Sequence, residues 1–323
     1  MGRVLADLTG DADAFAEALA ERTARVFRPA GWPAGLPRAA ELEAVLNGGL
    51  LRVPYVEMVR DGAVLAPERF CTVRTVAGRP EDGWADPGRI AALLAEGVTL
   101  LLPQLDQWYA PVRALAAGLA LGLGRRTEAF CFATAAGGRG LKVHRDDADV
   151  LVVQLAGEKE WTVHRPPADG HWQPGLVPAP GPVALRTVLA PGQALYVPRG
   201  APHAATGRQG LSVHLSFTVR EPGTGRLHAA LGEHLAAAPL GTGLPERPLP
   251  EDELLAAAAE VLRRGRERLA ALTPEDLLRL ARGPLPDPDV PPPPFRSGDN
   301  SGQWPPGSTS RPAATGPASS SPR

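Results

Sequence analysis

Residues 142–150, KVHRDDADV, place one histidine and three carboxylates directly before the apolar run LVVQLAG. Crowded negative charge at the start of a buried strand does not help folding, whereas a bound metal ion would use it. His144 and Asp146 are two residues apart, and on extended backbone such residues point to the same side. The spacing therefore predicts that both side chains bind one ion.

A third ligand must come from a distant segment, and His203 is the candidate, because it follows the turn PRG at the start of a β-rich stretch. Two imidazoles and one carboxylate on one face of an octahedron are typical of non-haem Fe(II) sites, which leave three positions for a chelating co-substrate and dioxygen. A lone His-x-Asp pair often marks a surface turn, so the prediction depends on His203 joining the pair.

Composition narrows the class of protein. The chain has 323 residues, of which 44 % are apolar, and a net charge of −1, which disfavours direct binding of nucleic acid by bulk charge. The two cysteines, Cys71 and Cys131, predict neither a disulfide framework nor a thiolate zinc site. The N-terminus lacks the apolar stretch of a signal peptide, and no apolar run approaches the ~20 residues that span a bilayer. We expect a cytoplasmic protein without a membrane segment.

The elements that must position these residues are short strands with Gly and Pro between them, from about residue 130 to 220. They predict a mainly β fold with flanking helices, a double-stranded β-helix of the cupin jelly-roll type. Helices are expected over 13–26, 38–49, 85–97 and 104–124, and three more between 225 and 282. The expected domains are a helix-and-strand lead-in (1–100), the barrel (101–220), a C-terminal helical region (221–282) and a disordered Pro/Ser/Gly tail (283–323).

The stretches GLKVHRDDADVLVVQLAGEKEWTVH and LAPGQALYVPRGAPHAA, with SVHLSFTV, resemble the metal-binding and distal segments of the JmjC-like cupin family of bacterial ribosomal oxygenases. The resemblance runs from about residue 30 to 220. It implies an iron(II)- and 2-oxoglutarate-dependent hydroxylase of protein side chains that uses dioxygen, with His144, Asp146 and His203 as iron ligands.

Lys159, in GEKEW, stands where this family carries a Lys or Arg that pairs with the distal carboxylate of 2-oxoglutarate. Alternation with Trp161 and Val163 predicts that all three face the barrel interior, where an ammonium can bind a dianion. A solvent-facing strand lysine is the alternative. Ser216 matches a small hydroxyl residue of the family that contacts the co-substrate, although a plain strand serine would fit the pattern as well. We expect His214 to pack in the core, His164 to be a surface or capping residue, and Asp147 and Asp149 to cap a turn.

The chain departs from the family at Phe130-Cys131-Phe132, where a polar residue and a tyrosine are usual. Phe132 removes a hydrogen bond to 2-oxoglutarate, which puts co-substrate affinity in doubt. Family members follow the barrel with a helical dimerisation region and a winged-helix domain. The C-terminal helical region of this chain is too short for both. A homodimer through the C-terminal helices is one expected partnership.

The leading hypothesis is therefore an oxygenase that hydroxylates a protein or peptide side chain, such as an Arg or His of a ribosomal protein. A peptide hydroxylase of specialised metabolism is a competitor within that class. A non-catalytic metal-binding cupin that has lost 2-oxoglutarate is the alternative from another class, and Phe132 supports it. A metal-dependent isomerase or dioxygenase on the same barrel would leave Lys159 unexplained.

Overall fold

The structure is a computed structural model that describes residues 2–60, 62–138 and 141–286. The expected disordered tail lies, from residue 287 onward, outside the described residues. In the described part of the chain, no helix is long and apolar enough to cross a membrane.

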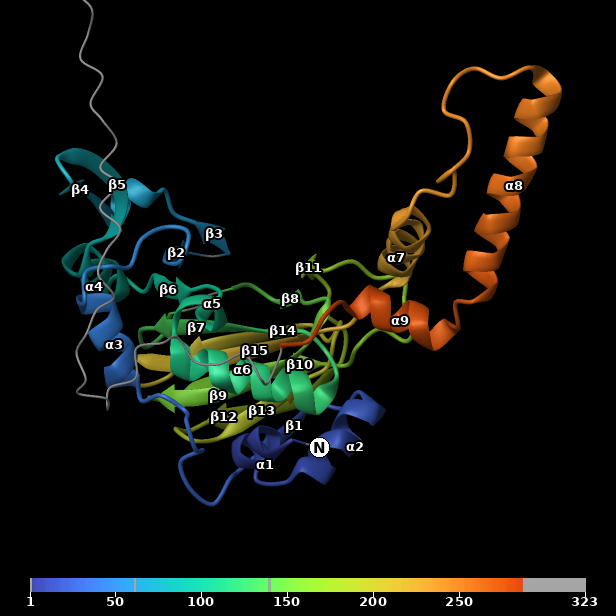
Figure 1. The fold of residues 1–323 in the computed structure, drawn as a ribbon. Helices are drawn as coiled ribbons and strands as arrows, with labels where there is room; N and C mark the ends of the chain where they lie inside the picture. The colour runs from blue at the N-terminus through green and yellow to red at the C-terminus, as the bar shows by residue number, and fades with distance from the viewer. Residues whose placement is uncertain (1, 61, 139–140, 287–323) are drawn as a thin grey trace, which may run out of the picture. The chain divides into compact units, whose positions relative to one another are not determined.

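The larger sheet has eight strands in the order β1-β13-β9-β15-β7-β6-β2-β3, all of whose pairings are antiparallel (Figure 1). Their bounds are Arg25–Phe27 (β1), Glu57–Arg60 (β2), Ala63–Val64 (β3), Thr99–Leu102 (β6), Thr127–Thr134 (β7), Ala148–Ala156 (β9), Ala194–Val197 (β13) and Ser212–Arg220 (β15). Four of these strands come from the first 102 residues, so the expected lead-in extends the barrel's own sheet.

The smaller sheet has five strands in the order β11-β8-β14-β10-β12. Their bounds are His144–Arg145 (β8), Lys159–His164 (β10), Gly175–Leu176 (β11), Val183–Leu189 (β12) and His203–Gly207 (β14). Val152 of β9 and Leu195 of β13 pack in one buried cluster with Trp161 of β10 and Leu189 of β12, which shows that the two sheets face each other. The predicted jelly roll is confirmed in these strands.

The apolar run of β9 is explained by burial on both faces. Val150 and Val152 join the cluster between the sheets, whereas Leu151 and Val153 join a second cluster on the opposite face. Helices cover that second face, and they bury Leu5 and other apolar side chains against it. These helices are Arg3–Thr9 (α1), Ala12–Glu21 (α2), Ala39–Asn47 (α3), Pro87–Ala95 (α4), Leu105–Trp108 (α5) and Ala110–Leu123 (α6).

Two helix predictions need correction. The helix expected over 13–26 ends at Glu21, because Arg22 adopts a left-handed conformation (φ 54°) and the chain then enters β1. The helix expected over 104–124 is two helices, since Tyr109 is extended and Pro111 sits in the first turn of α6. Proline fits there because its missing N–H has no partner in a first turn.

A hairpin that was not predicted from the sequence joins Cys71–Val76 (β4) to Arg79–Ala85 (β5). It follows the 3-10 turn Pro67–Arg69 (η1). Its two-residue turn places Ala77 and Gly78 at positive φ (49° and 80°). Alanine is an unusual first residue in such a turn, so the sequence carried a weak signal.

Three helices follow the barrel: Thr224–Ala236 (α7), Glu251–Ala270 (α8) and Pro274–Arg282 (α9). A capping box begins α9, because the Thr273 hydroxyl accepts from Asp276 N and the Asp276 carboxylate accepts from Thr273 N. The guanidinium of Arg282 donates to Glu221, directly after β15, which connects α9 to the barrel.

Candidate functional site

A cavity of about 350 Å³ opens between the two sheets, and side chains of both sheets line it. The larger sheet contributes Phe130, Phe132 and Thr134 from β7, and His214, Ser216 and Thr218 from β15. The smaller sheet contributes His144 and Arg145 from β8, Lys159 and Trp161 from β10, and His203 and Ala205 from β14. Alternate residues of β7 and β15 therefore face the cavity, and those between them face the helices.

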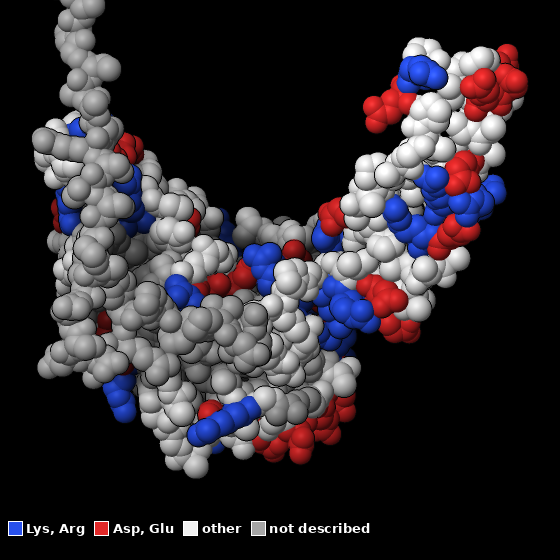
Figure 2. Space-filling view, in the orientation of Figure 1, with Lys and Arg blue, Asp and Glu red and all other residues white. Residues whose placement is uncertain are grey.

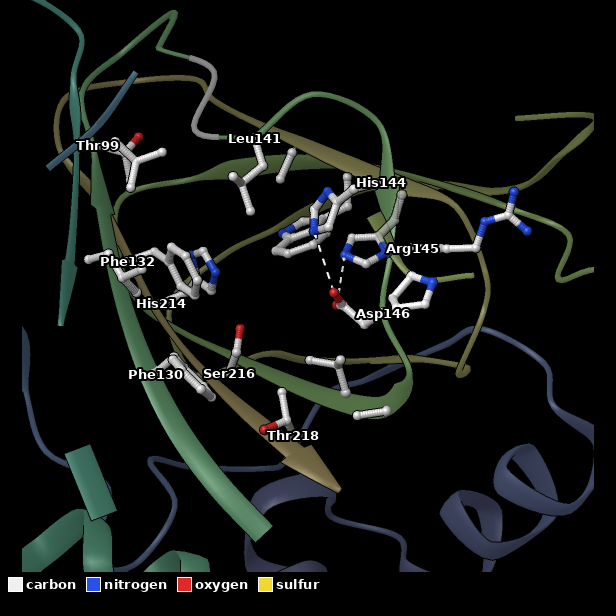
Figure 3. A pocket seen from close by; sticks show the side chains of 18 of the residues that line it. Thr99, Phe130, Phe132, Leu141, His144, Arg145, Asp146, His214, Ser216 and Thr218 are labelled. Atoms are coloured by element: carbon white, nitrogen blue, oxygen red, sulfur yellow. Dashed lines mark ion pairs between the residues drawn. The ribbon is translucent and has the colours of Figure 1, made fainter. Parts of the chain in front are cut away.

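His144, Asp146 and His203 converge on one point at the wall of this cavity, and Figure 3 shows His144 and Asp146 there. One ligand atom from each lies within 4.8 Å of those of the other two. His203 Nε2 is 3.6 Å from one Asp146 carboxylate oxygen, and His144 Nε2 is 3.9 Å from the other. His144 and His203 are also direct partners across β8 and β14, which fixes the spacing of the two imidazoles.

Both imidazoles are oriented by their second nitrogen. His144 Nδ1 lies 2.9 Å from the carbonyl of Lys142, and His203 Nδ1 lies 3.0 Å from the carbonyl of Ala201. Because a carbonyl only accepts, each Nδ1 carries the proton, and each Nε2 presents a lone pair to the cluster. This arrangement is usual for metal-binding histidines.

The donor set fits a divalent metal ion. Burial and the neighbouring His144 hold the pKa of the His203 imidazole well below its usual range, so it is neutral at physiological pH. Two neutral imidazoles and one carboxylate are the ligands that ferrous iron uses in open three-ligand sites. The structure thus brings together the three residues that the sequence singled out.

Lys159 faces the same cavity and is 3 % exposed. The predicted alternation of β10 is confirmed, since Lys159, Trp161 and Val163 are all buried. The Lys159 ammonium nitrogen lies 3.1 Å from Thr134 Oγ1 and 3.1 Å from His214 Nδ1. Thr134 Oγ1 in turn lies 3.0 Å from Thr99 Oγ1, so a chain of polar contacts crosses the inner end of the cavity.

His214 is a residue of the site that the sequence reading assigned to the core. Its ring stacks on Phe132, with centroids 5.0 Å apart and planes at 9°, and meets the Trp161 ring edge-on at 5.3 Å. Ser216 lies two residues further along β15 and faces the cavity as well (Figure 3). A signal was available, because polar residues at every second position of this strand, His214, Ser216 and Thr218 among them, alternate with the apolar residues Val213, Leu215, Phe217 and Val219.

Other predicted residues lie elsewhere. Asp147 lines the cavity mouth and pairs with Arg220. Asp149 is buried on the helix-covered side, where its carboxylate accepts from Tyr196 Oη at 2.8 Å. His164, expected to be a surface or capping residue, is buried rather than at the surface, and its Nδ1 lies 2.8 Å from the carbonyl of Gly181.

Residues 120–227 match the sequence model of the JmjC domain. The barrel is therefore similar to a JmjC domain over these residues. The match confirms the resemblance that the two motifs indicated, and the matched segment contains His144, Asp146 and His203 together with Lys159 and His214.

Relatives of the JmjC domain include human Ribosomal oxygenase 1, which is 29 % identical over 198 residues, covering 59 % of this chain and 29 % of the human protein. The Bifunctional lysine-specific demethylase and histidyl-hydroxylase NO66 of Drosophila simulans is 26 % identical over 148 residues, covering 43 % of this chain and 17 % of that protein. The chain therefore spans less than a third of the length of each of these two relatives. Among solved structures, YcfD, a ribosomal oxygenase from Escherichia coli in complex with cobalt and 2-oxoglutarate, aligns with a TM-score of 0.48 at 18 % identity, covering 81 % of this chain and 68 % of that one.

Proposed function

We propose that this protein is an iron(II)- and 2-oxoglutarate-dependent oxygenase that hydroxylates a side chain of a protein or peptide. The observation that carries the proposal is the convergence of His144, Asp146 and His203 on one wall of a cavity that also holds a buried lysine. The names of the relatives, ribosomal oxygenase and histidyl-hydroxylase, support the same reaction class.

In this proposal His144 Nε2, His203 Nε2 and the Asp146 carboxylate bind the iron. When bound, the iron supplies the oxidising power for a dioxygen-dependent hydroxylation coupled to decarboxylation of 2-oxoglutarate to succinate. The protein orients the ligands through the Lys142 and Ala201 carbonyls, which hold both imidazoles in the tautomer that leaves Nε2 unprotonated.

Lys159 binds the distal carboxylate of 2-oxoglutarate. Its position supports this role, because a buried amine can give a charge-assisted hydrogen bond to an anion that has left water. Ser216 faces the same cavity and adds a hydroxyl toward the co-substrate. Phe130, Phe132 and Trp161 supply apolar walls that exclude water from the reacting groups.

The substrate reaches the site through the cavity mouth, which Arg145, Asp147 and Arg220 border on the polar side. We propose a ribosomal protein as the substrate, by analogy with the names of the relatives. A peptide of specialised metabolism is the competing substrate, and a cytoplasmic location stays a prediction from the sequence.

A non-catalytic metal-binding role is the second candidate. Phe132 favours it, because a phenyl ring stacked on His214 offers no hydroxyl to a co-substrate. The buried Lys159 weighs against it. Burying an amine costs folding free energy, and a ligand-binding role gives a reason for that cost, whereas a purely structural cavity does not.

The C-terminal helices support the proposed homodimer. Leu255, Leu262 and Leu269 recur every seventh residue on α8 and are 65 %, 57 % and 44 % exposed. Figure 2 shows acidic and basic side chains mixed along the same helix. A leucine stripe at heptad spacing with charges beside it is typical of helices that pair with a second helix.

The test of function is turnover of 2-oxoglutarate by iron-loaded protein, measured as succinate formed with and without ribosomal-protein peptides that contain Arg or His. Succinate formation that a peptide stimulates, with a mass increase of one oxygen on that peptide, is the expected result. Tight iron binding with no succinate under either condition would favour the non-catalytic candidate.

A further inference from the structure

Almost all Lys and Arg positions of the chain are arginine. Its 34 basic residues include two lysines, Lys142 and Lys159. Lys142 is exposed, whereas Lys159 is the only buried Lys or Arg side chain in the part of the chain that the structure describes. A guanidinium keeps its charge at every physiological pH, but an amine can lose its proton. The one buried basic position is thus occupied by the residue type that can titrate.

The surroundings of Lys159 favour the neutral amine. Burial lowers the pKa of Lys159 to about 7. One titratable group contacts it, His214 of β15, and a second, Cys131 of β7, lies nearby on the helix-covered face of that strand; both are buried. The remaining neighbouring strands present uncharged residues, namely Leu189 of β12, Gly207 of β14 and, through Thr134, Thr99 of β6. Within the described residues no carboxylate forms an ion pair with Lys159.

The two neighbours of Lys159 hold its nitrogen in place in either protonation state. Burial keeps the pKa of His214 well below its usual range, so this imidazole is neutral and its Nδ1 can accept from Lys159. Thr134 Oγ1 accepts a second N–H. An ammonium has three N–H donors, and the third is available to a ligand in the cavity.

We propose that Lys159 is a neutral amine in the empty cavity and takes up one proton from solvent when the 2-oxoglutarate dianion binds, with His214 as the positioning residue. This inference rests on the proposed function, because it takes 2-oxoglutarate as the ligand of Lys159. An incoming carboxylate supplies the partner charge that the empty cavity lacks, and so favours the ammonium. Binding is then coupled to pH. Above about pH 7 the dissociation constant rises close to tenfold per pH unit, and below that value it is nearly constant.

Calorimetry tests the coupling directly. Mn²⁺-loaded protein is titrated with 2-oxoglutarate at about pH 8.5 in two non-chelating buffers that both hold this pH but differ in ionisation heat, such as EPPS and Tris, and at about pH 6 in a corresponding pair such as MES and Bis-Tris. The difference in heat between the two buffers gives the number of protons exchanged. Uptake of nearly one proton is expected, falling to near zero at about pH 6. Lys159→Arg should bind 2-oxoglutarate with no uptake at either pH, because a guanidinium is already charged.

The outcomes separate this inference from the proposed function. Tight binding of 2-oxoglutarate without proton uptake would overturn the inference and leave the function standing. Equal uptake by Lys159→Arg would assign the proton to another group and would also overturn it. No binding of 2-oxoglutarate by the parent protein would overturn the proposed function itself.

A second measurement needs no variant and begins with metal-free protein. In metal-free protein labelled with ¹³C at lysine Cε, the two lysines give two resonances, and the exposed Lys142 serves as an internal control. Lys159 should titrate near pH 7, far below the ~10.4 of a lysine in a model peptide. Adding Zn²⁺ and 2-oxoglutarate should move the Lys159 transition upward by at least one pH unit. Coincident titration of both lysines in the metal-free protein would contradict the inference.

The role of His214 is tested by two variants. His214→Leu removes the acceptor and should weaken 2-oxoglutarate binding about tenfold, since a hydrogen bond to a charged group is lost. His214→Gln keeps an acceptor and should restore most of the affinity and the proton uptake. Loss of affinity in both variants with unchanged proton uptake would reduce His214 to a packing residue.

Discussion

Lys159 Nζ and His214 Nδ1 lie 3.1 Å apart, although their residues are 55 positions apart in the chain and belong to different sheets. Lys159 is on β10 of the smaller sheet, and His214 is on β15 of the larger one. The contact therefore joins the two walls of the barrel at the inner end of the cavity. The position of the Lys159 amine therefore depends on both sheets.

The buried amine makes stability depend on pH in a definite direction. The unfolded chain keeps the lysine proton up to about pH 10.5, whereas the folded chain releases it near 7, so folding releases a proton between these values. The free energy of unfolding of the metal-free protein should then rise with pH across this window, by up to ~1.4 kcal/mol per unit. Urea unfolding of the parent and of Lys159→Met at several pH values measures the difference. If the free energy of unfolding changes with pH in the same way in both proteins, the prediction is contradicted.

Asp146→Ala should abolish tight iron binding, because it removes the only anionic ligand and leaves two neutral imidazoles to hold a dication. The barrel should still fold, since the Asp146 side chain is 36 % exposed. Asp147→Ala is the matched control, as it removes the adjacent carboxylate, which pairs with Arg220, and should leave metal affinity unchanged. Equal iron affinity in the two variants, measured by metal titration, would argue against the ligand assignment.

Lys159→Ala should weaken 2-oxoglutarate binding by roughly 30-fold or more, because truncating one member of a buried charge pair typically costs ~2–5 kcal/mol. Iron binding should be unaffected, and Lys159→Arg should retain part of the affinity. Lys142→Ala, at the other lysine of the chain, is the control. Anaerobic titration of the iron-loaded proteins, followed by the charge-transfer absorption, gives the dissociation constants. An unchanged constant in Lys159→Ala would revive the non-catalytic role.

Phe132→Tyr should tighten 2-oxoglutarate binding by about fivefold, equivalent to one net hydrogen bond of ~1 kcal/mol. Phe132 already faces the cavity and stacks on His214, so the added hydroxyl would extend from a ring whose position is set by packing. Anaerobic titration of the iron-loaded variant with 2-oxoglutarate measures this change in affinity. A weaker affinity would show that the cavity accommodates 2-oxoglutarate in a way that uses the phenyl ring as it is.

Leu262→Glu should shift the protein from dimer to monomer if α8 pairs with a second copy, because it places a charge in the middle of the leucine stripe. Leu211→Glu is the control, since Leu211 is similarly exposed, at 47 %, in the turn before β15. Light scattering during size-exclusion chromatography measures both masses. A monomeric parent protein would rule out the proposed homodimer.

The sequence by itself determined the local features of this protein. Alternation along β10 placed Lys159, Trp161 and Val163 on one face, and the capping residues of α9 fixed where that helix begins. The spacing of His144 and Asp146 predicted their common direction, because side chains on extended backbone repeat every second residue. These features depend on neighbours in the chain, which the sequence displays directly.

The tertiary structure decided which distant segments meet. Pairing of β8 with β14 brought His203 beside His144, and the facing of the two sheets brought His214 to Lys159. The sequence assigned His214 to the core because burial and participation in a site look alike along a single strand. The extent of α2 also depended on packing, since β1 pairs with β13 where helical spacing alone favoured a longer helix. Contacts between strands are set by sheet order, and no pattern within one strand encodes that order.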